Sequence, residues 1–137
     1  MQLDKNNAIV QLCAKGMEME GKGEMSMAKE IFSEAWNTAT TDFERLIAAH
    51  YVARHQSSVQ EKLKWDETAL KYALNTASNG MLPSLYLNIA KCYEELHDLD
   101  NAKANYIAAQ SFVNFLPSDN YGNMIRTGIS NGLARIS

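Results

Sequence analysis

The sequence predicts an all-α fold, and three observations favour it. Apolar residues recur at three- and four-residue intervals along the whole chain, which is the period of an amphipathic helix. Nowhere do they alternate with polar residues, as they would in a half-buried strand. The breaks between the apolar segments are short and carry turn-forming residues, so the helices are expected to follow one another closely.

The first four helices are expected between residues 8 and 77, over 8–20, 27–39, 43–55 and 58–77. Gly21 and Gly23 mark the first break, and the stretch from Thr40 to Asp42 marks the second, because these residue types favour turns. The residues that set the helical period in these four segments are Ile9, Leu12, Cys13, Gly16 and Met17; Met27, Ala28, Ile31, Phe32, Ala35, Trp36 and Ala39; Phe43, Leu46, Ile47, His50 and Tyr51; and Val59, Leu63, Ala69, Leu70, Ala73, Leu74 and Ala77.

Three more helices are expected over 84–96, 99–113 and about 120–136. Pro83 suits a first helical turn and Asp119 suits a helix N-cap. The breaks are Asn79-Gly80, His97-Asp98 and Leu116-Pro117-Ser118. The residues that set the period here are Leu85, Tyr86, Ile89, Ala90, Tyr93 and Leu96; Leu99, Ala102, Tyr106, Ala109 and Val113; and Met124, Ile125, Ile129, Leu133 and Ile136.

Composition is that of an ordinary globular domain. The 137 residues are 46% hydrophobic and 21% charged. A chain of this length buries about two-thirds of its unfolded surface when it folds. The net charge is −3, from 13 Lys and Arg against 16 Asp and Glu, and no basic stripe is visible. Proteins that depend on phosphate contacts carry a basic excess, so nucleic acid is not expected as the main partner.

The sequence shows no pattern typical of a signal peptide, a membrane span or a metal site. Met1 to Asn7 lack the basic-then-apolar order of a signal peptide. No apolar run approaches the roughly 18 residues of a membrane span. Cys13 and Cys92 lie far apart and are expected to be reduced core residues. The three histidines have no Cys or His at metal-ligand spacing, so we expect no metal, no cofactor, no membrane contact and a cytoplasmic location.

Two parts of the chain repeat the same spacing of small and large residues. The offsets of 3, 4, 5, 4 and 3 residues are identical in the two sets. Small residues are needed where two helices approach closely, and large residues fill the space beside them. The two sets are Gly16, Met19, Gly23, Ala28, Phe32 and Ala35, and Ala90, Tyr93, His97, Ala102, Tyr106 and Ala109.

This spacing resembles the tetratricopeptide repeat, a 34-residue helix–turn–helix unit. The resemblance covers residues 9–40 and 83–116 well. It covers residues 41–82 less well, because the stretch from Arg54 to Ser58 replaces a tight glycine turn and the following helix is longer by about two turns. It implies a single domain over residues 1–137, a tetratricopeptide-like right-handed superhelix of about three helix–turn–helix pairs plus a C-terminal capping helix. An unrelated helical bundle is the alternative.

The last helix is expected to depend on packing. Gly122, Gly128 and Gly132 make it a weak helix in isolation, so Ile125, Ile129 and Leu133 should hold it against the third pair. Ser130, Asn131 and Arg135 suit its solvent side.

No pattern of catalytic residues is found. The segment from Gly16 to Gly23 approaches a phosphate-binding loop, but it lacks the final hydroxyl and lies in a helical pattern instead of following a strand. Rossmann-type chemistry needs a βαβ unit, and none is predicted. Glu94 and Glu95 are adjacent in a helix and point about 100° apart, which indicates a solvated face. We therefore expect a protein that is not an enzyme.

The resemblance implies a function in protein interaction. In tetratricopeptide proteins the first helix of each pair lines a concave groove that binds an extended peptide or a partner helix. Arg45, Asn88 and Lys91 are then expected to hold a carboxylate or peptide backbone, and Met17 to add an adaptable contact. The family's clamp for chaperone C-termini needs Lys and Asn where this chain has Cys13 and Met17, so such tails are not expected. The positions implied to face the groove are Val10, Cys13, Met17, Glu20, Arg45, Ala49, Val52, Ser84, Leu87, Asn88, Lys91 and Glu94.

Several alternatives remain open. If no partner binds in the groove, Arg45 and Lys91 are expected to be solvated surface charges and Met17 to be part of the core. A small-molecule sensor or enzyme would place His50, Arg54 and His55 in a closed pocket between the first two units. A homo-oligomer would use the N-terminal end near Trp36 and its methionines, and a further possibility is a subunit of a larger complex.

Overall fold

The computed structural model describes residues 4–137, so Met1 to Leu3 lie outside it. This range holds seven α-helices and two short 3₁₀-helices and contains no strand. The α-helices are α1 (Ala8–Gly21), α2 (Met25–Thr38), α3 (Asp42–Ala53), α4 (Val59–Asn75), α5 (Leu82–Glu95), α6 (Leu99–Ser111) and α7 (Asn120–Ile136). The 3₁₀-helices η1 (Asn79–Met81) and η2 (Val113–Phe115) were not expected from the sequence. The expected all-α fold is confirmed.

Most helices begin at a polar side chain that accepts hydrogen bonds from free backbone N–H groups of the first turn. Thr41 and Glu44 form a capping box at α3, which satisfies two such groups reciprocally. Asp119 caps α7 and Pro83 lies in the first turn of α5, as predicted. The capping side chains are Asn7, Thr41, Ser58, Asp98 and Asp119.

The turns after α1 and α5 share one geometry. Gly23 and His97 occupy matching places in the repeated spacing, and both adopt a positive φ, of 78° and 61°. In each turn the next backbone N–H donates to a carbonyl five residues back, Glu24 to Met19 and Asp98 to Tyr93, at 2.9 Å. A positive φ is uncommon for a residue with a side chain, so the match at His97 shows that the spacing repeats in backbone conformation too.

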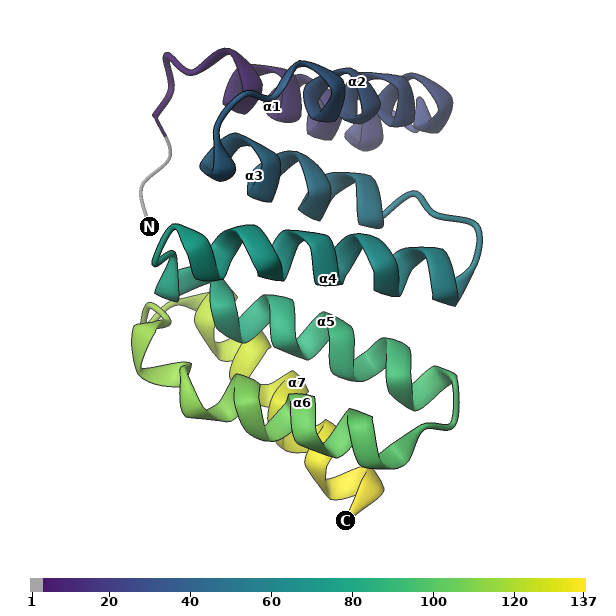
Figure 1. Cartoon of the computed structure of the whole chain (residues 1–137), viewed down its shortest axis with the longest axis vertical. Coiled ribbons are helices and arrows are strands. Elements are labelled where there is room, and N and C mark those ends of the chain that lie inside the picture. The colour runs from purple at the N-terminus through teal and green to yellow at the C-terminus, as the bar shows by residue number, and fades with distance from the viewer. Residues whose placement is uncertain (1–3) are drawn as a thin grey trace.

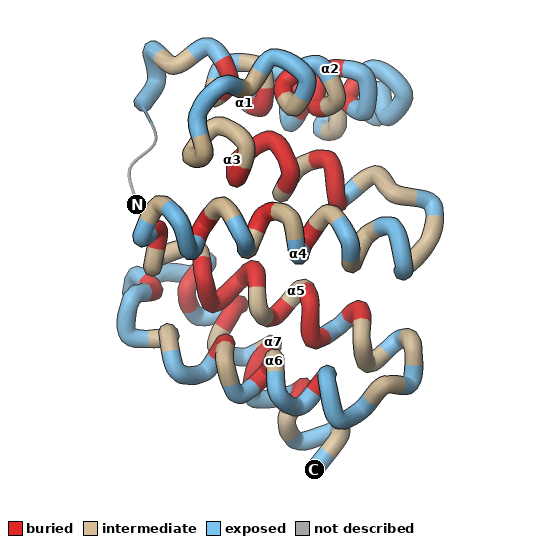
Figure 2. The backbone as a smooth tube through the Cα atoms, viewed as in Figure 1, coloured by how far each residue is buried: buried red, intermediate tan, exposed pale blue. Residues whose placement is uncertain are grey.

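The helices pack in adjacent pairs along the chain (Figure 1). The pairs α1–α2, α3–α4 and α5–α6 stack in order, and α7 lies against α6 and α5. Buried positions are densest on α3 and α5, in the middle of the stack (Figure 2). The repeated residues Phe32 and Tyr106 are both fully buried between their neighbours. This arrangement is consistent with a helical-repeat superhelix.

The middle pair departs from the other two. Helix α4 has 17 residues, against 14 in α2 and 13 in α6, so it is longer by about one turn and not by the predicted two. Helix α1 packs against α3, and α5 packs against α7, but α3 and α5 are barely in contact. The space left between them becomes the site described below.

Helix α7 covers the end of the stack through its small and apolar residues. Ile125 and Ile129 are buried in a cluster with Tyr106, and Leu133 packs against that cluster, as predicted. A Cβ at Gly132 would overlap the Tyr106 ring, which explains a glycine in the middle of this helix. Among residues 4–137, no helix is long and apolar enough to cross a bilayer.

Candidate binding groove

A depression opens where α3, α4, α5 and α7 come together. Its first part has a volume of about 390 Å³ and is lined by His50 of α3, Lys62 of α4 and Asn88 of α5, with Arg54 at the end of α3. The exposed Met124 of α7 forms part of its rim. The depression therefore lies between the second pair, the third pair and the last helix, where α3 and α5 are separated.

The depression continues between α5 and α7. A second part of about 280 Å³ shares Asn88 and Lys91 with the first, and a third part of about 210 Å³ shares Lys91. Arg135 lines both of these further parts. We refer to the whole as the α5–α7 groove, which runs from His50 through Asn88 and Lys91 to Arg135.

Helix α5 supplies one wall of the groove. Ser84, Asn88, Lys91 and Glu95 recur at four-, three- and four-residue steps and so lie on one face. The buried Ser84 hydroxyl donates to the carbonyl of Met81, 3.2 Å away. Among the described residues 4–137, neither the Asn88 amide nor the Lys91 ammonium has a hydrogen-bond or ion-pair partner. Both groups are therefore available to a ligand.

Most of the cations on the groove wall are paired with a carboxylate. Arg54 is held by Glu20 at 3.0 Å and Lys62 by Asp66 at 2.9 Å, and these ion pairs offset most of their charge. In the further parts, Glu94 holds Arg135 in the same way, at 2.9 Å. Lys91, which has no ion-pair partner among residues 4–137, is therefore the cation that favours an anionic ligand.

The surroundings of His50 lower the pKa of its imidazole. Burial, together with the nearby charges of Arg54 and Lys62, lowers the pKa of its imidazole to about 4. Its Nδ1 is buried and has no hydrogen-bond partner among the described residues. His50 is therefore a neutral ring at pH 7, and its low basicity makes it a weak proton acceptor.

Cys92 also lines the groove but is not activated. Burial is the largest of the causes that raise the pKa of its thiol to about 11. The Lys62 ammonium lies 3.9 Å from Sγ, and the Asp66 carboxylate lies 3.7 Å from it. The thiol is protonated at pH 7, so it adds polarisable surface and no nucleophile.

Loss of stability in mild acid is expected to depend on His50. Its folded-state pKa lies below the unfolded value of 6.5, so the unfolded chain takes up the proton first as the pH falls. Stability present above pH 6.5 is therefore lost between pH 6.5 and 4. Urea unfolding at pH 7 and pH 4.5 measures this loss. Between these two pH values, the free energy of unfolding of His50→Phe should fall by about 2 kcal/mol less than that of the wild type. His97→Asn, which removes an exposed imidazole, should follow the wild type, and equal losses in all three proteins would contradict this assignment.

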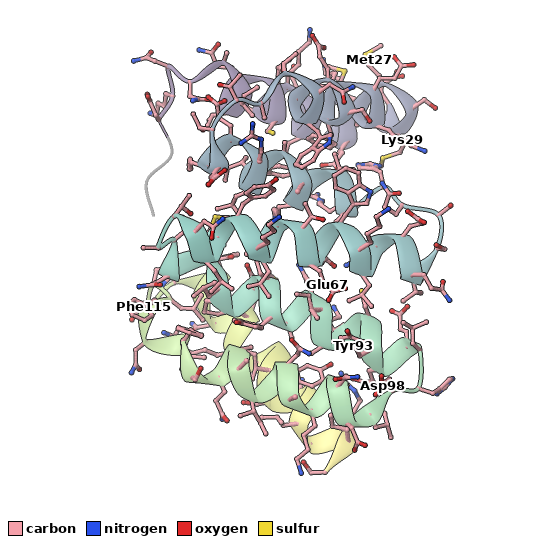
Figure 3. The ribbon with its side chains drawn as sticks, in the orientation of Figure 1. Met27, Lys29, Glu67, Tyr93, Asp98 and Phe115 are labelled. Carbon is pink, nitrogen blue, oxygen red and sulfur yellow. The ribbon has the colours of Figure 1, made fainter. Side chains whose placement is uncertain are left out.

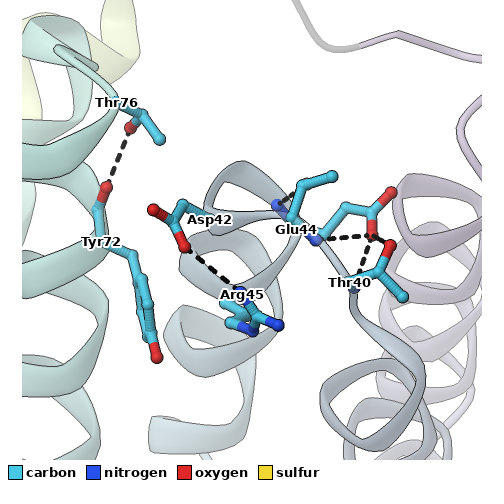
Figure 4. A network of polar contacts seen from close by, with 7 residues as sticks. Thr40, Asp42, Glu44, Arg45, Tyr72 and Thr76 are labelled. Atoms are coloured by element: carbon cyan, nitrogen blue, oxygen red, sulfur yellow. Dashed lines mark hydrogen bonds and ion pairs between the residues drawn. The ribbon is translucent and has the colours of Figure 1, made fainter.

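Not all predicted site residues come together. Asn88 and Lys91 meet in the groove, but Arg45 does not join them. Its guanidinium pairs with Asp42 at 3.2 Å and lies over the Tyr72 ring of α4, 5.9 Å from the centroid (Figure 4). The predicted cluster of Arg45 with Asn88 and Lys91 is therefore wrong, because α4 attracts the Arg45 side chain.

Other expected groove positions also lie elsewhere. Cys13, Ala49 and Val52 are buried in the core, which corrects their assignment to the groove wall. Met17 is exposed on α1 and does not line the groove. Ser84 and Leu87 do line it, although both are largely buried.

The alternative set of polar residues is divided as well. His50 and Arg54 line the α5–α7 groove, but the His55 Nε2 lies 2.6 Å from Glu20 Oε2 and joins the end of α3 to α1. The expected closed pocket between the first two units is therefore replaced by an open groove farther along the stack.

The N-terminal end of the stack holds the residues named for a homo-oligomer contact. Trp36 is half-buried, and its ring contacts the Trp65 ring of α4 edge-on, with centroids 5.0 Å apart. Met25 and Met27 remain exposed on α2, and Met27 lies on the outer side of that helix (Figure 3).

Sequence reasoning missed the contribution of α4. Asp66 lies on the apolar face of that helix, three residues after Leu63 and three before Ala69, and is 1% exposed. A carboxylate at such a position, with Lys62 four residues earlier, was the available signal for a buried ion pair. The residues of α7 that line the groove gave no such signal, because their position depends on the long-range packing of the last helix.

No protein-family model matches the chain. No curated protein and no solved structure matches it at a significant level either.

Proposed function

We propose that this chain is a non-enzymatic, tetratricopeptide-like interaction module that binds an acidic segment of a partner protein in the α5–α7 groove. The observation that carries the proposal is the pair of unpartnered polar side chains in the middle of the groove, Asn88 and Lys91. An amide and an ammonium at adjoining positions offer donors for a carboxylate and for a peptide carbonyl.

The form of the groove supports an extended ligand. Asn88 lines its first two parts, and Lys91 lines all three, so a chain lying along α5 would pass both residues. Much of the wall belongs to helices held in place by buried packing, which lowers the cost of ordering the site on binding. The matching turns at Gly23 and His97 support the tetratricopeptide-like assignment.

The free cation of the groove favours acidic segments. Arg54 and Lys62 are held by their own counter-ions, whereas Lys91 has no ion-pair partner among the described residues. An incoming carboxylate would meet Lys91 without having to displace a carboxylate of the protein. Such contacts are charge-assisted and weaken as salt is added.

A selection from a displayed library of random decapeptides tests this function. The wild type should enrich peptides with an excess of Asp and Glu, and Lys91→Glu should bind the enriched peptides at least tenfold more weakly, about 1.4 kcal/mol. Lys103→Glu makes the same charge change on α6, away from the groove, and is the matched control. Enrichment without an acidic excess, or equal losses in the two variants, would contradict the proposal.

A small anionic molecule is the second candidate. The observation that favours it is the first part of the groove, whose volume of about 390 Å³ has room for a small molecule and which Arg54, Lys62 and Lys91 line. A small ligand would bind in the first part of the groove alone, so its binding would respond to Arg54→Ala but not to Arg135→Ala. Losses in both variants would favour the extended segment.

A further inference from the structure

A second hollow, of about 340 Å³, adjoins the α5–α7 groove. It is built by α3, by η1, by η2 and the segment after it, and by the start of α7. Ile47, Met81, Phe115 and Pro117 form its apolar walls, and no Lys, Arg, Asp or Glu is among its lining residues, all of which lie in the described part of the chain. It is therefore suited to an apolar group, in contrast to the groove beside it, where Lys91 offers a free cation.

The two hollows share a wall. His50 and Tyr121 line both the second hollow and the first part of the groove. Tyr121 is 46% exposed, and Phe115 is 53% exposed at the edge of the molecule (Figure 3). With Met124, 61% exposed in the groove, they form an apolar rim that connects the two hollows.

We infer that the second hollow is a specificity subsite that takes one large apolar side chain of the same acidic partner segment. The inference rests on the proposed function and deepens it. One free cation alone selects partners by charge and therefore weakly. Burial of an apolar side chain at a fixed distance from the carboxylate adds selection for a particular sequence. The segment recognised would then combine an acidic group, held at Lys91, with a large aliphatic or aromatic residue held between Phe115 and Tyr121.

Half of the subsite's lining residues come from the connections between helices. Gly80 and Met81 belong to η1, and Phe115 and Pro117 come from η2 and the connection to α7. Consequently the preference for an apolar residue should belong to this chain's own connecting segments. It should also be removable without loss of binding to acidic peptides.

Fluorescein-labelled decapeptides of Gly and Ser with two central Glu residues test this inference. One Leu is moved through the positions on either side of the Glu pair, and binding is followed by fluorescence anisotropy. The wild type should bind one or two of these peptides about tenfold more tightly than the peptide without Leu. Phe115→Ala should remove this gain and keep the affinity for the peptide without Leu, while Leu74→Ala, which truncates an exposed leucine of α4, should change neither.

The outcomes separate the two proposals. Binding that requires the Glu pair but is indifferent to Leu at every position would overturn the subsite and leave the proposed function standing. A gain from Leu that Phe115→Ala does not reduce would also overturn the subsite, because the residue would be bound elsewhere. Peptides with Lys in place of Glu that bind as tightly would overturn the proposed function itself.

Discussion

Phe32→Ala is expected to lower the free energy of unfolding by about 3–5 kcal/mol, the range for removing a fully buried aromatic side chain. The Phe32 ring has 0% exposure and stacks on the Tyr51 ring with centroids 5.0 Å apart. On the other side it covers Gly16, where an added Cβ would overlap the ring. The side chain therefore joins α1, α2 and α3, and its loss leaves a cavity that these three helices cannot close easily.

Urea unfolding followed by circular dichroism measures this effect, and a double-mutant cycle tests its cause. Gly16→Ala alone should destabilise by about 1–3 kcal/mol through overpacking, despite the higher helix propensity of alanine. Combined with Phe32→Leu, which removes the ring, it should cost less than the sum of the two single changes. Strict additivity would show that Gly16 is not needed for the approach of Phe32.

Asp66→Ala is expected to lower the free energy of unfolding by about 2–3 kcal/mol. Breaking a buried ion pair costs about 3–5 kcal/mol when the remaining charge has no access to water. Here the Lys62 side chain is 37% exposed and can turn toward the groove, so the loss should lie at or below the lower end of that range. Asp66 itself is 1% exposed, and its burial raises the pKa of its carboxyl despite the Lys62 ammonium.

The double variant Lys62→Met/Asp66→Leu is the matched control for this pair. Replacing both charges with apolar groups of similar size leaves no uncompensated charge, so the double variant should be more stable than Asp66→Ala. Urea unfolding at pH 7 makes the comparison. A double variant no more stable than the single one would show that packing around Asp66, and not the ion pair, determines the loss.

The helices and their pairing are the part of the fold that the sequence predicts well. The apolar period and the turn residues predict each α-helix found in residues 4–137, and the matched offsets relate Gly23 to His97. These features depend on neighbours in sequence, because an amphipathic helix and its caps are set within a few residues.

The groove is less predictable, because it depends on contacts between distant helices. The apolar period predicts which face of its helix Arg45 lies on, but it does not predict which other helix packs against that face. In the structure, Tyr72 of α4 lies against Arg45. The same limit applies to His50 and His55, which are five residues apart in sequence. His50 lines the groove, whereas His55 contacts Glu20 of α1. The separation of α3 from α5, which opens the groove, follows from the packing of the divergent middle pair and is encoded in no single residue.

The most direct test of the α5–α7 groove as the binding surface is a titration of the isotopically labelled protein with an acidic decapeptide from the selection, followed by amide NMR shifts. The account predicts that the largest shifts occur at Asn88, Lys91 and Ile125 and that α2 is unaffected. Shifts centred on Met25 and Met27 of α2, with the groove unchanged, would contradict it and move the interaction surface to the N-terminal end of the stack.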